Sequence, residues 1–233
     1  MNKEAARQMV EEVRQAGRTA LSEYEAKQVL AAYEIPVPAE MLVAGPDELE
    51  AAVEKIGWPL VMKGCAAEIA HKTEKNLIRV DIRDLDEARQ ALAEIMAGLG
   101  DAAGSVLVQE MVPGRRELAV GMSRDAQFGV CVMFGLGGIL TEILEDVVFG
   151  KAPLSRTEAR QMLGEIRGHR ILEAIRGMAA ADVDQLAGIL VQVGQIGLDM
   201  DMVAEIDINP VIISGSRPVA VDALVVLRPP ATE

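Results

Sequence analysis

The stretch Glu205-Ile206-Asp207-Ile208-Asn209-Pro210 alternates strictly between polar and apolar residues. This pattern predicts a β-strand with one buried face, and it places Glu205, Asp207 and Asn209 together on one side. Oxygen-bearing side chains in a row repel one another unless a cation or a hydrogen-bond donor lies among them. Mg²⁺ prefers such ligands and usually takes one or two carboxylates together with phosphate oxygens. The alternative is a capped strand end at an ordinary Asn-Pro turn.

A further acidic residue, Asp222, interrupts the apolar run of residues 219–227. If this run forms a strand that pairs with the strand predicted at residues 202–208, Asp222 completes the cluster around Asp207. The end of the chain is therefore predicted to hold two strands with acidic side chains between them.

Helix and strand patterns alternate through the rest of the chain, with hairpins mixed among them. Capping boxes predict helices that begin after Ser22 and Ser155. Residues 77–82 alternate, with Ile78, Val80 and Ile82 on one face of a predicted strand. Together these patterns predict an α/β or α+β protein with a mixed sheet. A Pro-Gly pair after Val112 marks a domain boundary near the middle of the chain.

Composition limits what the protein can be. The chain has 233 residues, half of them apolar and only six aromatic, so its core must be aliphatic. A formal net charge of −13 and the few aromatic residues argue against a nucleic-acid partner. Cys65 and Cys131 are predicted to be buried free thiols. A charged N-terminus and the lack of a run of about 20 apolar residues predict no signal peptide, no membrane partner and a cytoplasmic location.

A local excess of positive charge lies between residues 60 and 79 of this acidic chain. Its basic residues are Lys63, Lys72, Lys75 and Arg79. Only Glu68 and Glu74 oppose them, and His71 lies among them. Such an island suits an anionic ligand because it concentrates the electric field where the ligand binds. Lys63 is expected at the end of an apolar strand, with its ammonium at a sheet edge. The alternative is a solvated loop with ordinary surface lysines.

Two more stretches could approach a ligand with their backbones. Gly135-Leu136-Gly137-Gly138 follows a predicted strand, and its glycines allow close approach of N–H groups, although a tight structural turn is an equal alternative. Gln109-Glu110-Met111-Val112 ends a strand at the Pro-Gly turn, where backbone groups free of sheet pairing could contact an adenine. The alternative there is a plain strand end, with Glu117 as a surface residue.

Seven short motifs occur in order along the chain. They are Leu21-Ser22-Glu23-Tyr24-Glu25-Ala26-Lys27, Ile35-Pro36-Val37-Pro38, Val61-Met62-Lys63, His71-Lys72-Thr73-Glu74, Val108-Gln109-Glu110-Met111-Val112, Phe134-Gly135-Leu136-Gly137-Gly138-Ile139 and Glu205-Ile206-Asp207-Ile208-Asn209-Pro210. In this order they resemble the ATP-grasp β subunit of ADP-forming (NDP-forming) acetyl-CoA synthetases, and more distantly the β chains of succinyl-CoA synthetases. Each motif alone is weak, whereas seven in order are specific.

The resemblance implies an α+β fold of the ATP-grasp type, in which two α+β subdomains hold ATP or ADP between them. Residues 20–112 would form the N-terminal, lid subdomain and residues 113–229 the C-terminal subdomain. The helix within residues 1–19 would pack on the C-terminal subdomain.

The resemblance also assigns roles to individual residues of this chain. Lys63 would hold ATP phosphates, Glu117 would bond the ribose, and Gly137 and Gly138 would shape the floor of the site. The backbone of the strand end would read the adenine, at Glu110, Met111 and Val112.

Metal binding and phosphate transfer follow from the same resemblance. Asp207, Asn209 and Asp222 would hold Mg²⁺, with Glu205 nearby. His71 resembles a phosphohistidine that carries phosphate between distant sites, and a neutral imidazole is a competent nucleophile near neutral pH.

A partner chain is implied as well, because this family handles CoA and the acid on a CoA-binding α subunit, with two copies of each subunit. The net reaction would be ATP + carboxylic acid + CoA giving ADP + phosphate + acyl-CoA, reversibly.

Two positions depart from the family pattern: Asn76 stands where glycine is usual, and Gly150-Lys151 stands where arginine is usual. They leave open a non-catalytic nucleotide-sensing or scaffold subunit. A stand-alone ATP-grasp carboxylate ligase is a third hypothesis.

Overall fold

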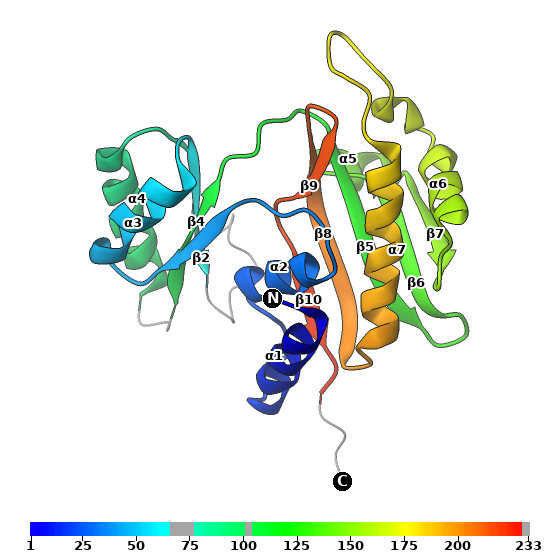
Figure 1. The fold of residues 1–233 in the computed structure, drawn as a ribbon, viewed down its shortest axis with the longest axis horizontal. Coiled ribbons are helices and arrows are strands. Elements are labelled where there is room, and N and C mark those ends of the chain that lie inside the picture. The colour runs from blue at the N-terminus through cyan, green and yellow to red at the C-terminus, as the bar shows by residue number, and fades with distance from the viewer. Residues whose placement is uncertain (66–76, 101–103, 230–233) are drawn as a thin grey trace. The chain divides into compact units, whose positions relative to one another are not determined.

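The computed structural model describes residues 1–65, 77–100 and 104–229, which form two compact units (Figure 1). The smaller unit is Pro38–Met111, and the larger unit combines Met1–Val37 with Val112–Glu233. Helices and antiparallel sheets occur in both units, which confirms the predicted α+β class. Within the described part of the chain, no helix is both long and apolar enough to cross a membrane.

The smaller unit is a four-stranded sheet with two helices on one face. Its elements are β1 (Glu40–Val43), α3 (Pro46–Ile56), β2 (Leu60–Cys65), β3 (Ile78–Ile82), α4 (Leu85–Leu99) and β4 (Ser105–Glu110). The strand order is β1-β4-β2-β3. Leu49 of α3 and Ile95 of α4 pack with Leu60, Met62 and Val108 of the sheet, so one sheet face is buried under the helices.

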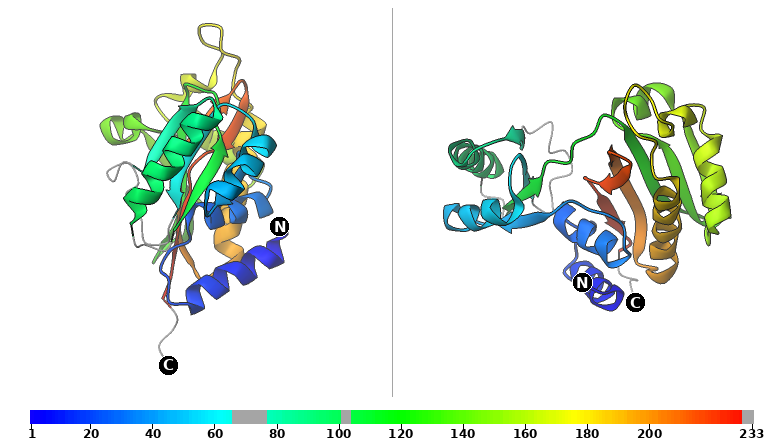
Figure 2. Two further views of the ribbon diagram at one scale, coloured as in Figure 1. Left: turned by 90° about the vertical axis from the view of Figure 1, so that its left-hand side faces the viewer. Right: turned by 45° about the horizontal axis from the view of Figure 1, so that its top comes forward.

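The larger unit is built around a six-stranded sheet. Its elements are α1 (Lys3–Gln15), α2 (Glu23–Ala32), β5 (Glu117–Asp125), β6 (Gly129–Leu136), α5 (Ile139–Leu144), β7 (Val147–Lys151), α6 (Arg156–Glu165), the 3-10 helix η1 (His169–Leu172), α7 (Val183–Asp199), β8 (Val203–Ser214), β9 (Arg217–Ala220) and β10 (Leu224–Leu227). The order is β10-β8-β5-β6-β7, with β9 paired to β8. Helix α7 lies on one face of the sheet and runs roughly along the strands (Figures 1 and 2), and its Leu190 and Val193 join Val132, Phe134 and Ile206 in the core.

The predicted mixed sheet is wrong, because every strand pair described in both units is antiparallel. Helix α3 joins β1 to β2, but β4 lies between those two strands. Helix α4 joins β3 to β4, and β2 lies between them. The helical connections therefore link strands that are not neighbours, so each strand pairs with one that runs in the opposite direction.

The predicted subdomain range of residues 20–112 needs correction at its start. Residues up to Val37 belong to the larger unit, where Ala26, Val29 and Leu30 of α2 share the core with strands β5, β8 and β10. The backbone just before α2 also joins this sheet, because Leu21 N–H donates to the Val225 carbonyl at 3.0 Å. Helix α1 contributes Ala6 and Val10 to the same core.

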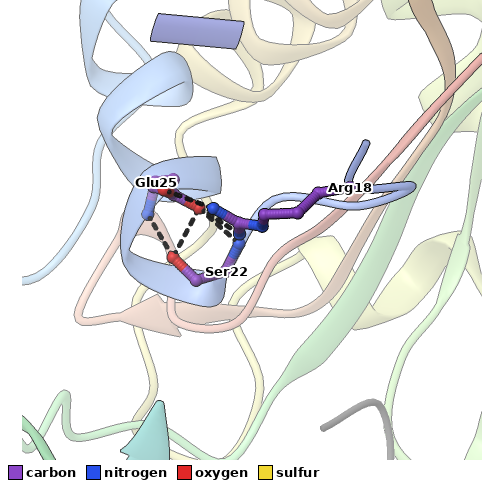
Figure 3. Close-up of polar contacts among 3 residues, drawn as sticks. All are labelled: Arg18, Ser22 and Glu25. Atoms are coloured by element: carbon purple, nitrogen blue, oxygen red, sulfur yellow. Dashed lines mark hydrogen bonds and ion pairs between the residues drawn. The ribbon is translucent and has the colours of Figure 1, made fainter. Parts of the chain in front are cut away.

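The entry to α2 is fixed by one carboxylate, that of Glu25 (Figure 3). Arg18 donates to both of its oxygens at 2.9 and 2.7 Å, and Ser22 donates its amide and its hydroxyl at 2.7 and 2.8 Å. Burial acts to raise the pKa of Glu25, but these hydrogen bonds and the charge of Arg18 outweigh it and lower the pKa. The capping box predicted at Ser22 is confirmed, as is the one at Ser155.

Strand β8 does not end at an Asn-Pro turn but runs on through Asn209 and Pro210 to Ser214. Its register with β5 shifts between the partners of Leu118 and Val120. A proline cannot donate to a sheet ladder, and such an irregularity lets a strand accommodate it.

The two cysteines are free thiols, of which Cys65 is buried and Cys131 only half-buried.

Candidate nucleotide and metal site

The acidic row of β8 lies on the face of the sheet opposite to the core. Ile206 and Ile208 are buried in the core, whereas Glu205 is exposed and Asp207 and Asn209 are half-buried. Asp207 occupies an inner strand, opposite Gly121 of β5 on one side and Leu224 of β10 on the other. The alternation predicted from the sequence is therefore confirmed, and it places three polar side chains on one face.

Asp222 lies in the short segment between β9 and β10, and both of these strands pair with β8. Burial raises the pKa of Asp207, and the negative charges of Glu205 and Asp222 raise it further. Asp222 also accepts a hydrogen bond from the amide of Ala223 at 2.9 Å. The predicted single strand over residues 219–227 is wrong, because β9 and β10 are separate strands and Asp222 lies between them, although its charge still acts on Asp207.

Three motifs that are far apart in sequence converge beside this row. Asn209 Oδ1 accepts a hydrogen bond from Gly138 N–H at 3.0 Å, and the Glu117 carbonyl accepts one from Gly137 N–H at 2.8 Å. Gly137 lies so close to β5 that a Cβ atom there would be 2.6 Å from the backbone of Leu118. Gly138 has φ +59°, and a Cβ atom on it would collide with the Glu117 carboxylate. Only glycine fits both positions.

The donor set matches a magnesium ion that is shared with a phosphate ligand. In the residues that the structure describes, no three His, Cys, Asp or Glu side chains lie close enough to hold a metal by themselves. Asp207 and Asp222 supply two carboxylates and Asn209 an amide oxygen. Mg²⁺ characteristically uses one or two carboxylates and completes its shell with water and phosphate oxygens. Burial and, after it, the charges of Glu205 and Asp222 raise the pKa of Asp207, and a bound cation would favour its ionised form.

Lys63 lies inside its sheet and not at an edge, which corrects the predicted position. It is part of β2, between β4 and β3, opposite Leu107 and Ile78. Met62 beside it faces the helices, so Lys63 projects from the other face, and its exposed fraction is only 6%. The run of residues 60–65 forms a strand throughout, and a lysine within such a run must point away from the core.

Gln109 belongs to a stretch that was considered from the sequence, but it was given no role there, although its position is comparable to that of Lys63. It lies in β4 opposite Val61 and is 2% exposed. The strand alternation could have identified it. Val106 and Val108 face the core, so Leu107 and the polar Gln109 must lie on the opposite face of β4.

The strand end offers fewer free backbone groups than expected. Glu110 N–H donates to the Ala39 carbonyl at 2.9 Å, and Met111 N–H donates to the Pro59 carbonyl at 3.1 Å. Of the backbone amides in the predicted adenine-reading stretch, only that of Val112 has no acceptor among the described residues.

A side chain at position 150 would require Met162 to move, because a Cβ atom on Gly150 would be 2.5 Å from the sulfur of Met162. Lys151 follows it on the opposite face of β7, exposed and paired with Cys131. His71 and Asn76 fall outside the described residues.

Comparison with known proteins identifies the family to which this chain belongs. A family profile described as an ATP-grasp domain matches residues 12–227. The β subunit of acetate–CoA ligase [ADP-forming] I from Pyrococcus furiosus is 39% identical over 95% of this chain and 97% of its own length. The β subunit of succinate–CoA ligase [ADP-forming] from Natronomonas pharaonis is 30% identical over 88% of this chain and 54% of its own length.

A solved structure supports the same family assignment. Dinucleotide-forming acetyl-coenzyme A synthetase 1 of Ca. Korarchaeum cryptofilum, in complex with coenzyme A and Ca-AMPCP, matches with a TM-score of 0.92 and 36% identity, over 96% of this chain and 100% of that chain. Another structure of that protein contains Mg-AMPPCP and a phosphohistidine segment pointing towards the nucleotide binding site. The chain therefore belongs to the ATP-grasp family, in the group that includes the β subunits of ADP-forming acetate–CoA ligases.

Proposed function

We propose that this chain is the nucleotide-binding subunit of an ADP-forming acyl-CoA synthetase. The reaction is ATP + carboxylic acid + CoA giving ADP + phosphate + acyl-CoA, and it is reversible. The observation that carries the proposal is that Asp207 shares a strand face with Asn209 and is influenced by the charge of Asp222, while Asn209 accepts a hydrogen bond from the amide of Gly138. Acidic oxygens beside a close-packed glycine turn suit a metal-bound phosphate group.

Asp207, Asn209 and Asp222 would hold Mg²⁺. The ion would neutralise phosphate oxygens and lower the barrier to phosphoryl transfer, which depends mainly on positioning and charge neutralisation. On the smaller unit, the ammonium of Lys63 would bind phosphate oxygens.

The nucleoside would be recognised by residues of β4 and β5. Val112 N–H would bond the adenine, together with carbonyl groups of Glu110 and Met111. The carboxylate of Glu117, held against Gly138, would accept hydrogen bonds from the ribose hydroxyls. Gly137 and Gly138 would allow the ligand to approach the backbone.

The phosphoryl group would pass to His71. A neutral imidazole nitrogen forms the new bond to phosphorus, the bond to the bridging oxygen breaks, and ADP leaves. The phosphohistidine then delivers the group to the acid, so that an acyl phosphate forms and CoA displaces phosphate from it.

A CoA-binding α chain would supply the sites for CoA and the acid. The support is that this chain matches a β subunit of such a ligase over 97% of that subunit's length. We expect a cytoplasmic assembly with two copies of each chain.

The test is a reconstitution. This chain is mixed with ATP, Mg²⁺, CoA and acetate, with and without a purified CoA-binding α chain. Acyl-CoA and ADP should form only when both chains and Mg²⁺ are present, and mass spectrometry should find phosphate on His71 during turnover. Synthesis of acyl-CoA by this chain alone would contradict the split site, and an unlabelled His71 would remove it from the mechanism.

The packing at Gly150 favours a second candidate, a nucleotide-sensing subunit without turnover. The family arginine is missing there, and Met162 fills the space that its side chain would start from. Binding of Mg-ATP without any acyl-CoA formation in the reconstituted complex would support this candidate.

A further inference from the structure

The glycine turn of residues 137–138 is braced by a threonine to which the proposed function gives no role. Thr141 is the third residue of the short helix α5, which begins directly after the turn. Its hydroxyl donates a hydrogen bond to the Leu136 carbonyl at 2.8 Å, and its amide donates one to the Gly138 carbonyl at 3.1 Å. One residue therefore bonds the chain on both sides of Gly137.

The hydroxyl bond of Thr141 is made in a sheltered place. Leu136 is only 4% exposed, and Thr141 itself is half-buried. A buried carbonyl that loses its donor is unfavourable, so the bond favours a single conformation of the chain where β6 ends. The N-cap of α5 is Gly138, which has no side chain to bond the first amides of the helix. The side chain of Thr141 thus supports a helix start that lacks an ordinary cap.

The turn meets the proposed metal site through one hydrogen bond. Gly138 N–H donates to Asn209 Oδ1 at 3.0 Å. Only the oxygen of a side-chain amide can accept from an N–H group, so this bond decides which end of the Asn209 amide faces the turn. An amide oxygen has two lone pairs, and the one that Gly138 does not use remains for a cation. Gly138 N–H therefore orients a predicted metal ligand.

The orientation of the Gly138 amide depends on how firmly the turn is held. Gly137 N–H donates to the Glu117 carbonyl at 2.8 Å, which fixes the beginning of the turn on β5. Two glycines in succession have more conformational freedom than any other pair, and φ of Gly138 is +59°. The bonds that Thr141 makes before and after Gly137 restrict this freedom. Without the hydroxyl, the Gly138 amide would turn away from Asn209 more readily.

We propose that Thr141 is a positioning residue for metal binding. By holding the glycine turn, it keeps Gly138 N–H on Asn209 and so presents Oδ1 of Asn209 to Mg²⁺. The inference rests on the proposed function for the metal site itself. Thr141 contacts neither the metal nor the nucleotide in this scheme. Its removal should therefore weaken only the part of nucleotide binding that depends on the metal.

The experiment measures the affinity of the full-length chain for ATP by isothermal titration, once with Mg²⁺ and once with EDTA. Thr141→Val keeps the shape of the side chain and removes the hydroxyl. It should bind Mg-ATP about three- to tenfold more weakly, a smaller loss than is typical for a residue that bonds a metal ligand directly. Its affinity for ATP in EDTA should be unchanged. Thr141→Ser keeps the hydroxyl and should bind Mg-ATP like the unmodified chain.

The matched control is Thr157→Val, the same change at an exposed threonine of α6, and it should leave both affinities unchanged. Hydrogen exchange followed by NMR gives a second readout that needs no ligand. The Gly138 amide should exchange faster in Thr141→Val than in the unmodified chain, and Thr141→Ser should restore the slow rate. Thr141→Ala, which also lacks the hydroxyl, should behave like Thr141→Val and replaces it if the valine variant does not fold.

The outcomes separate the two proposals. If Mg²⁺ gives the unmodified chain no gain in ATP affinity, the proposed function fails and the role of Thr141 fails with it. If Mg²⁺ raises the affinity of Thr141→Val as much as that of the unmodified chain, only the role of Thr141 is overturned. An equal loss of affinity with Mg²⁺ and with EDTA would indicate a general structural role and would overturn it as well.

Discussion

Two half-buried carboxylates of the larger unit differ in what surrounds them. Glu25 receives hydrogen bonds from Arg18 and Ser22, and its pKa is lowered. Asp207 lies beside Glu205 and Asp222, and its pKa is raised. The first arrangement stabilises the ionised acid inside the fold, whereas the second opposes ionisation. The contrast separates a carboxylate whose charge its neighbours stabilise from one whose charge burial and its acidic neighbours oppose.

The largest effect should come from breaking the Asp207 cluster. Asp207→Asn keeps the shape of the side chain but removes a metal-binding charge, so acyl-CoA formation with the α chain should fall by about 100-fold or more. Steady-state kinetics at several Mg²⁺ concentrations measure this. The matched control is Asp201→Asn, an exposed aspartate just before β8. Similar losses in both variants would mean that Asp207 has no specific role.

Lys63 tests the phosphate side of the proposal. Lys63→Met keeps the length of the stem and removes the ammonium, so kcat/KM for ATP should fall by roughly 10- to 100-fold. Lys55→Met on α3 serves as control, since Lys55 is an exposed lysine of the same unit. Circular dichroism should show both variants folded. Unchanged kinetics in Lys63→Met would contradict its assignment to the phosphates.

The Glu25 site should affect stability and leave function intact. Glu25→Gln removes the ion pair with Arg18 and half of the capping box at Ser22, which should cost about 1 kcal/mol of unfolding free energy. Urea unfolding measures this. Binding of Mg-ATP should not change, and a loss of binding larger than the loss of stability would show that the two regions are coupled.

The smallest expected effects are changes in how the stability of the fold depends on pH. Because the folded pKa of Glu25 lies below its unfolded value of about 4.3, its contribution is present above that pH and is lost as the pH falls through the folded value. Asp207 has the opposite sign, since its folded pKa is raised. Its ionisation weakens the fold as the pH rises above about 3.9. Urea midpoints between pH 3.5 and 7 should therefore diverge for Glu25→Gln and Asp207→Asn in opposite directions relative to the unmodified chain. Parallel pH curves would contradict both assignments.

Features that depend on residues close together in the chain could be predicted from the sequence. The capping boxes at Ser22 and Ser155 depend on residues three positions apart, and the alternation in β8 depends on a period of two. Asp207 and Asn209 were placed on one face by this alternation, whereas Asp222 was added on the condition of a single strand over residues 219–227, which the structure divides into β9 and β10.

Features that depend on how distant parts of the chain meet in space could not be predicted from the sequence. Val80 was expected on the same face as Ile82, but Val80 is 65% exposed and Ile82 is buried. Asp81 between them has φ +59°, and the register of β2 with β3 shifts there, so the alternation breaks. The buried guanidinium of Arg116 donates to four backbone carbonyls from three separate segments, which no local pattern in the sequence announces.

The most direct test of the central claim is thermal unfolding of the unmodified chain and of Asp207→Asn, each with and without Mg-ATP. Without ligand, Asp207→Asn should unfold at the higher temperature at pH 7, because it removes a charge that burial and the acidic neighbours oppose. With Mg-ATP at about 100 times its Kd, the unmodified chain should gain about 2.7 kcal/mol, and Asp207→Asn should gain little. Equal stabilisation of both proteins by Mg-ATP would contradict the assignment of Asp207 to the metal and nucleotide site.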